Sequence, residues 1–219
     1  MVEPPVGPEA SRSERRRLTV ARLFGFDRSG PPPPQTRAGE PLRPWTIPNA
    51  IGFLRLSLIP VFLVIALSSN DGQDALATTL FAVIGWGDYA DGIAARVTRQ
   101  YSRLGALMDP ITDRLLIVSG VIVTWDFELL PRWALAVLAV RELAMLAIAR
   151  YGLSRGVDLA INWPGRLAVG PVMSSLFFAM ASLRTFAEVL LYLGLLLALV
   201  ATVMYARSGL SQLADQADR

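Results

Sequence analysis

The chain has 219 residues, of which 53% are hydrophobic, and its 21 basic and 18 acidic residues give a formal net charge of +3. It has no cysteine, no histidine and no lysine, which excludes disulfides, thiolate metal sites, imidazole bases and Schiff-base chemistry. The mean hydropathy of +0.44 and the long apolar runs favour one membrane domain over two soluble domains.

Residues 1–45 differ from the rest of the chain. They hold three consecutive arginines at 15–17, four consecutive prolines at 31–34 and little apolar periodicity. Such a segment buries too little surface to offset its ordering entropy, so we expect a largely disordered tail. The alternative is a short interfacial helix over residues 18–26, drawn to anionic lipid by its arginines. No apolar core closely follows the first basic residues, so no signal peptide is predicted.

Six apolar segments follow, each close to the length of about 20 residues that a helix needs to cross the hydrocarbon core. They cover residues 47–67, 75–99, 106–125, 132–151, 165–183 and 189–205. We therefore predict an all-α membrane protein with six transmembrane helices. They form one domain, residues 46–207, and a short cytoplasmic tail follows at 208–219.

Arginine residues set the predicted orientation. The N-terminal tail and the loops after the second and fourth segments are rich in arginine, whereas the first opposite loop carries Asp71 and Asp74 with no base. By the positive-inside rule, both chain ends and the arginine-rich loops face the cytoplasm. A basic complement made only of arginine is typical of GC-rich bacterial genomes, so we place the protein in a bacterial plasma membrane.

Four acids lie in or near the second and third spans, where ionisable residues are costly and usually functional. Asp88 and Asp91 are three residues apart and Asp109 and Asp113 are four apart, so each pair shares one face of its helix. A short turn joins the two spans, which makes them antiparallel neighbours. We expect the four carboxylates to converge near the cytoplasmic end.

Converging carboxylates repel one another unless cations lie between them. Oxygen ligands favour Mg²⁺, Mn²⁺ or Ca²⁺ over zinc or copper. Two ions about 4 Å apart would use four carboxylates well, and such a pair holds the attacking and leaving oxygens in phosphoryl chemistry. The sequence therefore predicts a site with two divalent metal ions.

Small residues accompany the acids. Gly92, Ala95 and Gly105 each lie four positions from one of the aspartates, which leaves room for a diphosphate or nucleotide to approach the backbone. Arg96 follows one turn after Gly92 and offers a planar fork for phosphate. Close helix packing is the alternative explanation for the small residues.

The segment from Asp88 to Asp113 resembles the signature of the CDP-alcohol phosphatidyltransferases. That signature reads D-x-x-D-G-x-x-A-R, a spacer of about eight residues, then G-x-x-x-D-x-x-x-D, and every fixed position is present. With the six spans, the resemblance extends from Trp45 to about Tyr205. It implies transfer of a phosphatidyl group from CDP-diacylglycerol to an alcohol with release of CMP.

The resemblance also implies roles for individual residues. The ligands of the Mg²⁺ or Mn²⁺ pair would be Asp88, Asp91, Asp109 and Asp113. Asp113 would also be the base that takes the proton of the acceptor hydroxyl. The residues that accommodate CDP would be Gly92, Ala95, Arg96 and Gly105, with Arg96 on the diphosphate. The partners implied are membrane lipid and a second copy of the chain in a homodimer, with no nucleic acid.

Three arginines outside the signature are candidates for binding a phosphate on the acceptor. Arg55 and Arg141 are intramembrane cations, which are costly unless they are paired or face a polar cavity, and Arg166 lies at the cytoplasmic entrance of the fifth span. The alternative is that Arg55 or Arg141 pairs with an acid for structural reasons. Arg141 and Glu142 are adjacent, so we expect their side chains to diverge toward different partners.

Other segments resemble the phosphatidylglycerophosphate synthase and actinobacterial-type cardiolipin synthase branch of the family. They are Thr46-Ile47-Pro48-Asn49, the run from Leu54-Arg55 to Pro60, Asp109-Pro110-Ile111-Thr112-Asp113-Arg114-Leu115, and Arg141-Glu142. Where that branch usually has G-K-x-x-T, this chain has Gly165-Arg166-Leu167-Ala168-Val169. We expect glycerol 3-phosphate as the acceptor, with phosphatidylglycerol as the second choice.

Two functions of other classes are alternatives to the enzyme. A divalent-cation transporter would also place carboxylates in a membrane. However, the acids gather at one end, and the fifth and sixth spans carry none that would continue an ion path. A non-catalytic scaffold that keeps the signature is the third interpretation, and only an activity measurement separates it from the enzyme.

Overall fold

The computed structural model describes residues 41–98, 100–154 and 163–217, and all regular structure in these residues is helical. The helices are α2 (Ile47–Ser68), α3 (Ala75–Thr98), α4 (Arg103–Asp126), α5 (Arg132–Ser154), α6 (Trp163–Met180) and α7 (Arg184–Ala217). The predicted all-α class is therefore confirmed. Most of the predicted tail, including the alternative helix at residues 18–26, lies outside the described residues.

Polar side chains define where the first three of these helices begin. Thr46 Oγ1 and Ser102 Oγ each accept a hydrogen bond from the backbone N–H three residues on, at 3.3 and 2.9 Å, and so cap α2 and α4. Asp74 Oδ1 does the same at the start of α3, at 2.9 Å. The starts of these helices agree with the predicted spans to within three residues.

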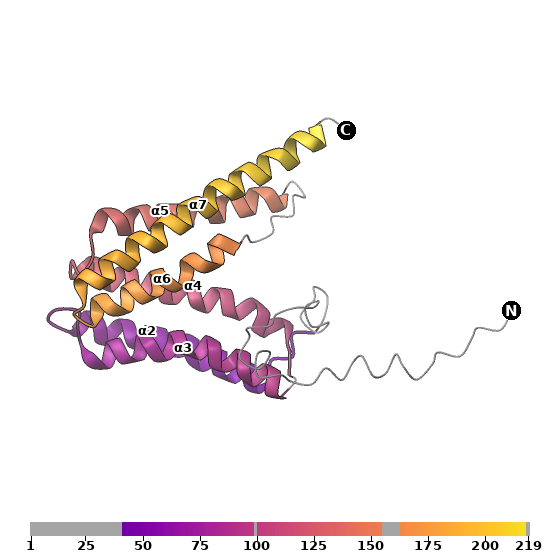
Figure 1. Ribbon diagram of the computed structural model, residues 1–219. Coiled ribbons are helices and arrows are strands. Elements are labelled where there is room, and N and C mark those ends of the chain that lie inside the picture. The colour runs from indigo at the N-terminus through magenta and orange to yellow at the C-terminus, as the bar shows by residue number, and fades with distance from the viewer. Residues whose placement is uncertain (1–40, 99, 155–162, 218–219) are drawn as a thin grey trace, which may run out of the picture.

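The helices form an up-and-down bundle (Figure 1). α2 packs against α3 and α4, α6 packs against α7, and contacts of α6 with α3 and α4 join the two groups. The short connections after α2, α4 and α6 lie at one end of the bundle, and the start of α2 and the end of α7 lie at the other. The end of α3 and the start of α4, which carry the signature, lie at this second end.

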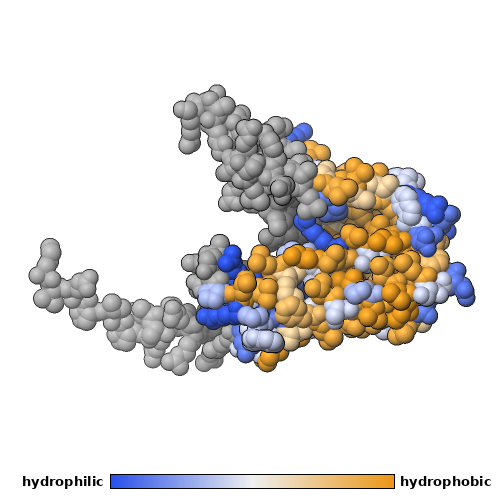
Figure 2. All heavy atoms as spheres, turned by 180° about the vertical axis from the view of Figure 1, so that it is seen from behind, coloured by the Kyte–Doolittle hydropathy of each residue, from blue (hydrophilic) through white to orange (hydrophobic). Residues whose placement is uncertain are grey.

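Within the described residues, two helices have the length and apolarity of a membrane span. They are α2 and the segment Arg184–Met204 of α7, and Leu167–Met180 in α6 is a shorter apolar segment. Large apolar side chains also lie on the outside of the bundle, among them Val140 and Leu143, which are 67% and 68% exposed. Figure 2 shows hydrophobic residues over much of the described surface, with hydrophilic residues gathered toward its ends. The count of six spans stays a prediction.

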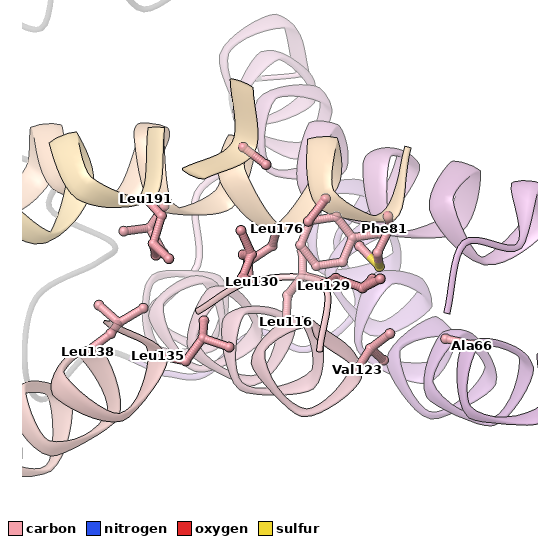
Figure 3. Packing of buried hydrophobic residues seen from close by; sticks show 14 of the residues in the cluster. Ala66, Phe81, Leu116, Val123, Leu129, Leu130, Leu135, Leu138, Leu176 and Leu191 are labelled. Carbon is pink, nitrogen blue, oxygen red and sulfur yellow. The ribbon is translucent and has the colours of Figure 1, made fainter. Parts of the chain in front are cut away.

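The hydrophobic core holds the acid-bearing helices in place. Phe81 of α3, Leu116 of α4, Leu176 of α6 and Leu191 of α7 meet there and are almost fully buried (Figure 3). Gly120 allows α4 to approach α3 and α6 closely, since a Cβ there would lie 2.8 Å from Phe81 and 3.0 Å from Leu176. The core therefore fixes α3 and α4 relative to each other, and their acidic ends lie beyond it.

Candidate active site

Three of the four signature aspartates converge. Asp88 and Asp91 near the end of α3 and Asp109 near the start of α4 each offer one carboxylate oxygen, and these oxygens lie within 4.8 Å of one another. Spacing of three residues on α3 and the antiparallel course of α4 produce this geometry. Asp91 is buried, whereas the Asp88 side chain is 48% exposed. A compact set of carboxylate oxygens fits a hard divalent cation such as Mg²⁺ or Mn²⁺.

The guanidinium group of Arg55 lies against the same acids. From α2, this buried side chain donates from Nη1 to Asp91 Oδ2 at 2.8 Å and from Nη2 to Asp113 Oδ1 at 3.0 Å. Its Nη1 also lies 3.6 Å from Asp88 Oδ1, and its Nε donates to the carbonyl oxygen of Ile84 at 2.9 Å. The contacts of Arg55 are therefore those of the alternative considered from the sequence, an arginine paired with acids inside the bundle.

Asp113 is linked to the other acids through Arg55. It follows Asp109 by one turn of α4, yet it does not belong to the group of three carboxylates whose oxygens lie within 4.8 Å. The sequence placed four carboxylates together, whereas the structure brings three together and ties the fourth to them through an arginine. The Asp113 side chain is 31% exposed, so a small polar group can reach it.

A pocket of about 200 Å³ opens beside the acids. Its lining includes all four residues predicted for CDP, namely Gly92, Ala95, Arg96 and Gly105, together with Asp91 and Asp109. A Cβ at Gly92 would lie 3.3 Å from Nη2 of Arg96, so the glycine leaves room for that guanidinium. The structure thus gathers the small residues, the arginine and two of the acids around one hollow.

Asn49 shapes this pocket, and sequence reasoning gave it no functional role. The buried side chain donates from Nδ2 to the carbonyl oxygens of Arg43 and Pro44 at 2.9 and 3.1 Å, and its Oδ1 accepts from Ser102 Oγ at 2.8 Å. A Cβ at Gly105 would lie only 2.8 Å from that Oδ1. The signal in the sequence is the segment Thr46-Ile47-Pro48-Asn49, whose resemblance to the family branch does not by itself assign a role to Asn49.

A second cavity, of about 700 Å³, lies between α3 and α6. Most of its lining is apolar or aromatic, including Phe81, Trp86, Met173, Phe177 and Phe178, and it reaches Asp88 and Tyr89. The cluster of three acids therefore borders two hollows. Asp91 lines the polar pocket, and Asp88 lines the apolar cavity. This combination suits a molecule with a charged head and an apolar tail.

Of the other two arginines predicted for the acceptor, Arg141 has a described side chain and Arg166 does not. Arg141 on α5 donates from Nε to Thr202 Oγ1 on α7 at 3.0 Å and also pairs with Glu142. The expected divergence of Arg141 and Glu142 is therefore wrong, because both side chains are long enough to bend toward each other although they leave the helix in different directions. Arg166 lies in the first turn of α6, and its side chain lies outside the described residues.

A family profile matches most of this chain. The profile described as CDP-alcohol phosphatidyltransferase matches residues 45–203, which is more than half of the sequence. The chain belongs to the CDP-alcohol phosphatidyltransferase family. The matched residues include the converging acids, Arg55 and the polar pocket beside them.

Individual relatives carry names from two branches of the family. A protein named putative cardiolipin synthase from Mycobacterium tuberculosis is 36% identical over 124 residues, or 56% of this chain and 58% of that protein. A cardiolipin synthase (CMP-forming) from Streptomyces coelicolor is 41% identical over 107 residues, or 47% and 49%. A CDP-diacylglycerol–glycerol-3-phosphate 3-phosphatidyltransferase from Bacillus subtilis is 28% identical over 135 residues, or 56% and 70%. The chain thus spans about half the length of the two synthases first named.

Proposed function

We propose that the protein transfers the phosphatidyl group of CDP-diacylglycerol to an alcohol and releases CMP. The observation that carries this proposal is that Asp91 and Asp109 each belong to two features of the site. Both are among the converging carboxylates, and both line the pocket that Gly92 and Arg96 also line. A diphosphate that binds metal and also carries a nucleotide needs both features side by side. Membership of the family supports the same reaction.

The carboxylates are the proposed metal ligands. Asp88, Asp91 and Asp109 would hold Mg²⁺ or Mn²⁺, with Asp113 as a further ligand and two ions per site. When bound, such ions neutralise charge on the phosphoryl and leaving oxygens. The apolar cavity that reaches Asp88 would accept part of the diacylglycerol, which keeps the phosphorus near the acids.

The polar pocket is the proposed site for the CDP portion. Arg96 offers a fixed pair of donors for the diphosphate. Three positions with little or no side chain, Gly92, Ala95 and Gly105, line the pocket in which the nucleotide would lie. Asn49 and Ser102, which line the same pocket, hold the start of α4 against the start of α2.

Asp113 is the proposed general base. The chain has no histidine, cysteine or lysine, so a carboxylate is the remaining type of base at this site. The hydroxyl oxygen of the acceptor would attack the phosphorus that carries diacylglycerol, and the bond from that phosphorus to the CMP oxygen would break. CMP would leave with the bonding electrons, and the hydroxyl proton would pass to Asp113.

Phosphatidylglycerol is the proposed acceptor, with glycerol 3-phosphate as the alternative. The sequence favours glycerol 3-phosphate, because three arginines are candidates for binding its phosphate. Arg55 is engaged by acids and Arg141 by Glu142 and Thr202, which leaves fewer cations for a dianion. The two relatives named cardiolipin synthase are also 36% and 41% identical, compared with 28% to 33% for relatives named glycerol-3-phosphate phosphatidyltransferase or phosphatidylglycerophosphate synthase.

The proposed setting is a bacterial plasma membrane, with six spans, both chain ends in the cytoplasm and a homodimeric assembly. The apolar character of α2 and α7 supports the membrane assignment. The start of α2 and the end of α7 lie at the same end of the bundle as the end of α3 and the start of α4, which supports a site on the side where the helical domain begins and ends.

The test is an assay of CMP release by the full-length protein in detergent micelles. CDP-diacylglycerol is supplied with phosphatidylglycerol or glycerol 3-phosphate, with Mg²⁺ or Mn²⁺, and with EDTA as the control. We expect CMP release with phosphatidylglycerol and metal and none with EDTA. Release only with glycerol 3-phosphate would overturn the acceptor and keep the transferase. No release with any alcohol, together with Mn²⁺ uptake into proteoliposomes, would replace the enzyme by the cation transporter.

A further inference from the structure

Arg55 connects three helices through one side chain. It leaves α2 with only 3% of its surface exposed, donates to Ile84 and Asp91 of α3, and donates to Asp113 of α4. Each of its three nitrogens has a different acceptor, so the plane of the guanidinium is fixed. A guanidinium plane that is fixed in this way also restricts the orientation of the carboxylates that it binds.

The guanidinium occupies one oxygen on each of two acids. It takes Oδ2 of Asp91 and Oδ1 of Asp113. These two contacts restrict rotation of each carboxylate and leave it further lone pairs for a metal ion or a proton. Because Arg55 holds both carboxylates, their orientation depends on it. One of them, Asp91, is among the converging carboxylates, and the other, Asp113, is the proposed base.

Gly87 provides the space that this side chain fills. A Cβ at position 87 would lie 2.6 Å from Cδ, 2.9 Å from Cγ and 3.0 Å from Nε of Arg55. Close-packed interiors do not absorb such contacts without movement, so the arginine would have to shift. A Cβ at Gly85, two residues earlier, would lie 3.7 Å from Leu116 and 3.9 Å from Met173, which is ordinary contact. Of these two glycines, only Gly87 lies where an added Cβ would collide with Arg55.

We propose that Arg55 is a positioning residue that orients Asp91 and Asp113 for their roles, and that Gly87 is the residue that admits it. The inference rests on the proposed metal site. It assigns the charge of Arg55 to the acids rather than to a phosphate on the acceptor.

A purely electrostatic role and a positioning role for Arg55 predict opposite effects of its removal on metal binding. If Arg55 were only a positive charge near the acids, it would oppose a dication, and its removal would tighten metal binding. If Arg55 positions the acids, its removal lets their carboxylates rotate and weakens metal binding. Loss of a group that orients a metal ligand typically costs about 10- to 100-fold in affinity or activity.

The experiment measures Mn²⁺ binding directly, from the electron paramagnetic resonance signal of free Mn²⁺, with full-length protein in detergent. Arg55→Lys keeps the charge and loses the fork, whereas Arg55→Met removes the charge from a chain of similar shape. We expect both variants to bind Mn²⁺ at least about tenfold more weakly than the native protein. CMP release at saturating Mn²⁺ should fall as well, because Asp113 also loses its orientation.

Glycine variants test the second half of the proposal. Gly87→Ala should weaken Mn²⁺ binding by about tenfold, whereas Gly85→Ala, the matched control, should bind Mn²⁺ as the native protein does. In an Arg55→Ala background, Gly87→Ala should add nothing, because the atoms that the new methyl group would meet are gone. If Gly87→Ala does not fold in detergent, the comparison of Arg55→Lys with Arg55→Met decides.

The outcomes separate this inference from the function on which it rests. Unchanged Mn²⁺ binding in Arg55→Lys, or tighter binding in Arg55→Met, would overturn the positioning role and leave the metal site standing. A native protein that does not bind Mn²⁺ would overturn the metal site and this inference together.

Discussion

Ser102 donates its hydroxyl hydrogen to Oδ1 of Asn49 at 2.8 Å, which ties the start of α4 to the start of α2. The amide nitrogen of Asn49 is engaged by two backbone carbonyl groups, so every polar atom of this buried side chain has a partner. Gly105 packs against the same Oδ1 atom. The wall of the polar pocket is therefore held by a hydrogen bond between two residues that are not fixed positions of the signature.

Gly105→Ala should destabilise the protein and weaken CDP-diacylglycerol binding. The new methyl group would displace Asn49, and a buried polar group that loses its partner costs about 1–3 kcal/mol of unfolding free energy. Thermal unfolding in detergent and KM for CDP-diacylglycerol measure the two effects. As a control for stability, Gly52→Ala places its Cβ 3.5 Å from the flexible end of Met108 and should unfold at nearly the native temperature. Native stability and KM in Gly105→Ala would contradict the proposed packing role.

Asp88→Ala and Asp109→Ala should each abolish CMP release while the protein stays folded. Each change removes a proposed metal ligand, and we expect a loss of at least about a hundredfold, equivalent to about 2.7 kcal/mol of barrier. Gel filtration and thermal unfolding establish that the variants fold. Full activity in either variant, or in the native enzyme with excess EDTA, would rule out the metal site.

Tags at the connections between helices test the proposed topology. A tag after Gly72 or after Glu128 should be accessible from outside the cell, and a tag after Gln100 should not. A membrane-impermeant reagent on whole cells, compared with lysed cells, makes the measurement. The reverse pattern would place the acids on the outer face, where the nucleotide of the donor is absent, and the proposed reaction could not occur there.

Arg141→Ala should affect stability more than acceptor binding. The change removes the partner of Glu142 and Thr202, which costs about 1–3 kcal/mol of unfolding free energy. Because a lone acid would remain, the double variant Arg141→Ala with Glu142→Ala should regain part of the loss. KM for phosphatidylglycerol should change less than about tenfold. A larger rise in KM for glycerol 3-phosphate, in an enzyme that uses it, would restore Arg141 as an acceptor ligand.

The sequence was sufficient for features that lie within one helix. Spacings of three and four residues place Asp88, Asp91 and Gly92 on neighbouring positions of one helix, and hydropathy locates the apolar segments. Hydropathy does not say where a helix ends, however. The last predicted span ends at residue 205, next to Met204 where the apolar segment of α7 ends, whereas the helix itself continues to Ala217, because leaving an apolar environment does not by itself stop a helix.

Features that join distant helices could not be predicted in the same way. Arg55 is 36 residues from Asp91 and 58 from Asp113, and nothing in the spacing within α2 selects these partners. The space at Gly87 is meaningful only when the arginine beside it is known. The pairing of Arg141 with Glu142 depends on how two long side chains bend, which helix geometry leaves open.

The contacts of Arg55 also bear on how the protein is made. In a membrane, α2 is the first described helix to emerge from the ribosome, and it carries an arginine whose partners follow on α3 and α4. An unpaired arginine at the centre of a span costs about 2.5–3.5 kcal/mol on insertion scales. The strongly apolar remainder of α2 offsets that free energy during insertion. Once α3 and α4 are inserted, pairing of Arg55 with their acids removes it. The first three described helices should therefore leave the insertion machinery as a single unit, with ion pairing as the step that completes it.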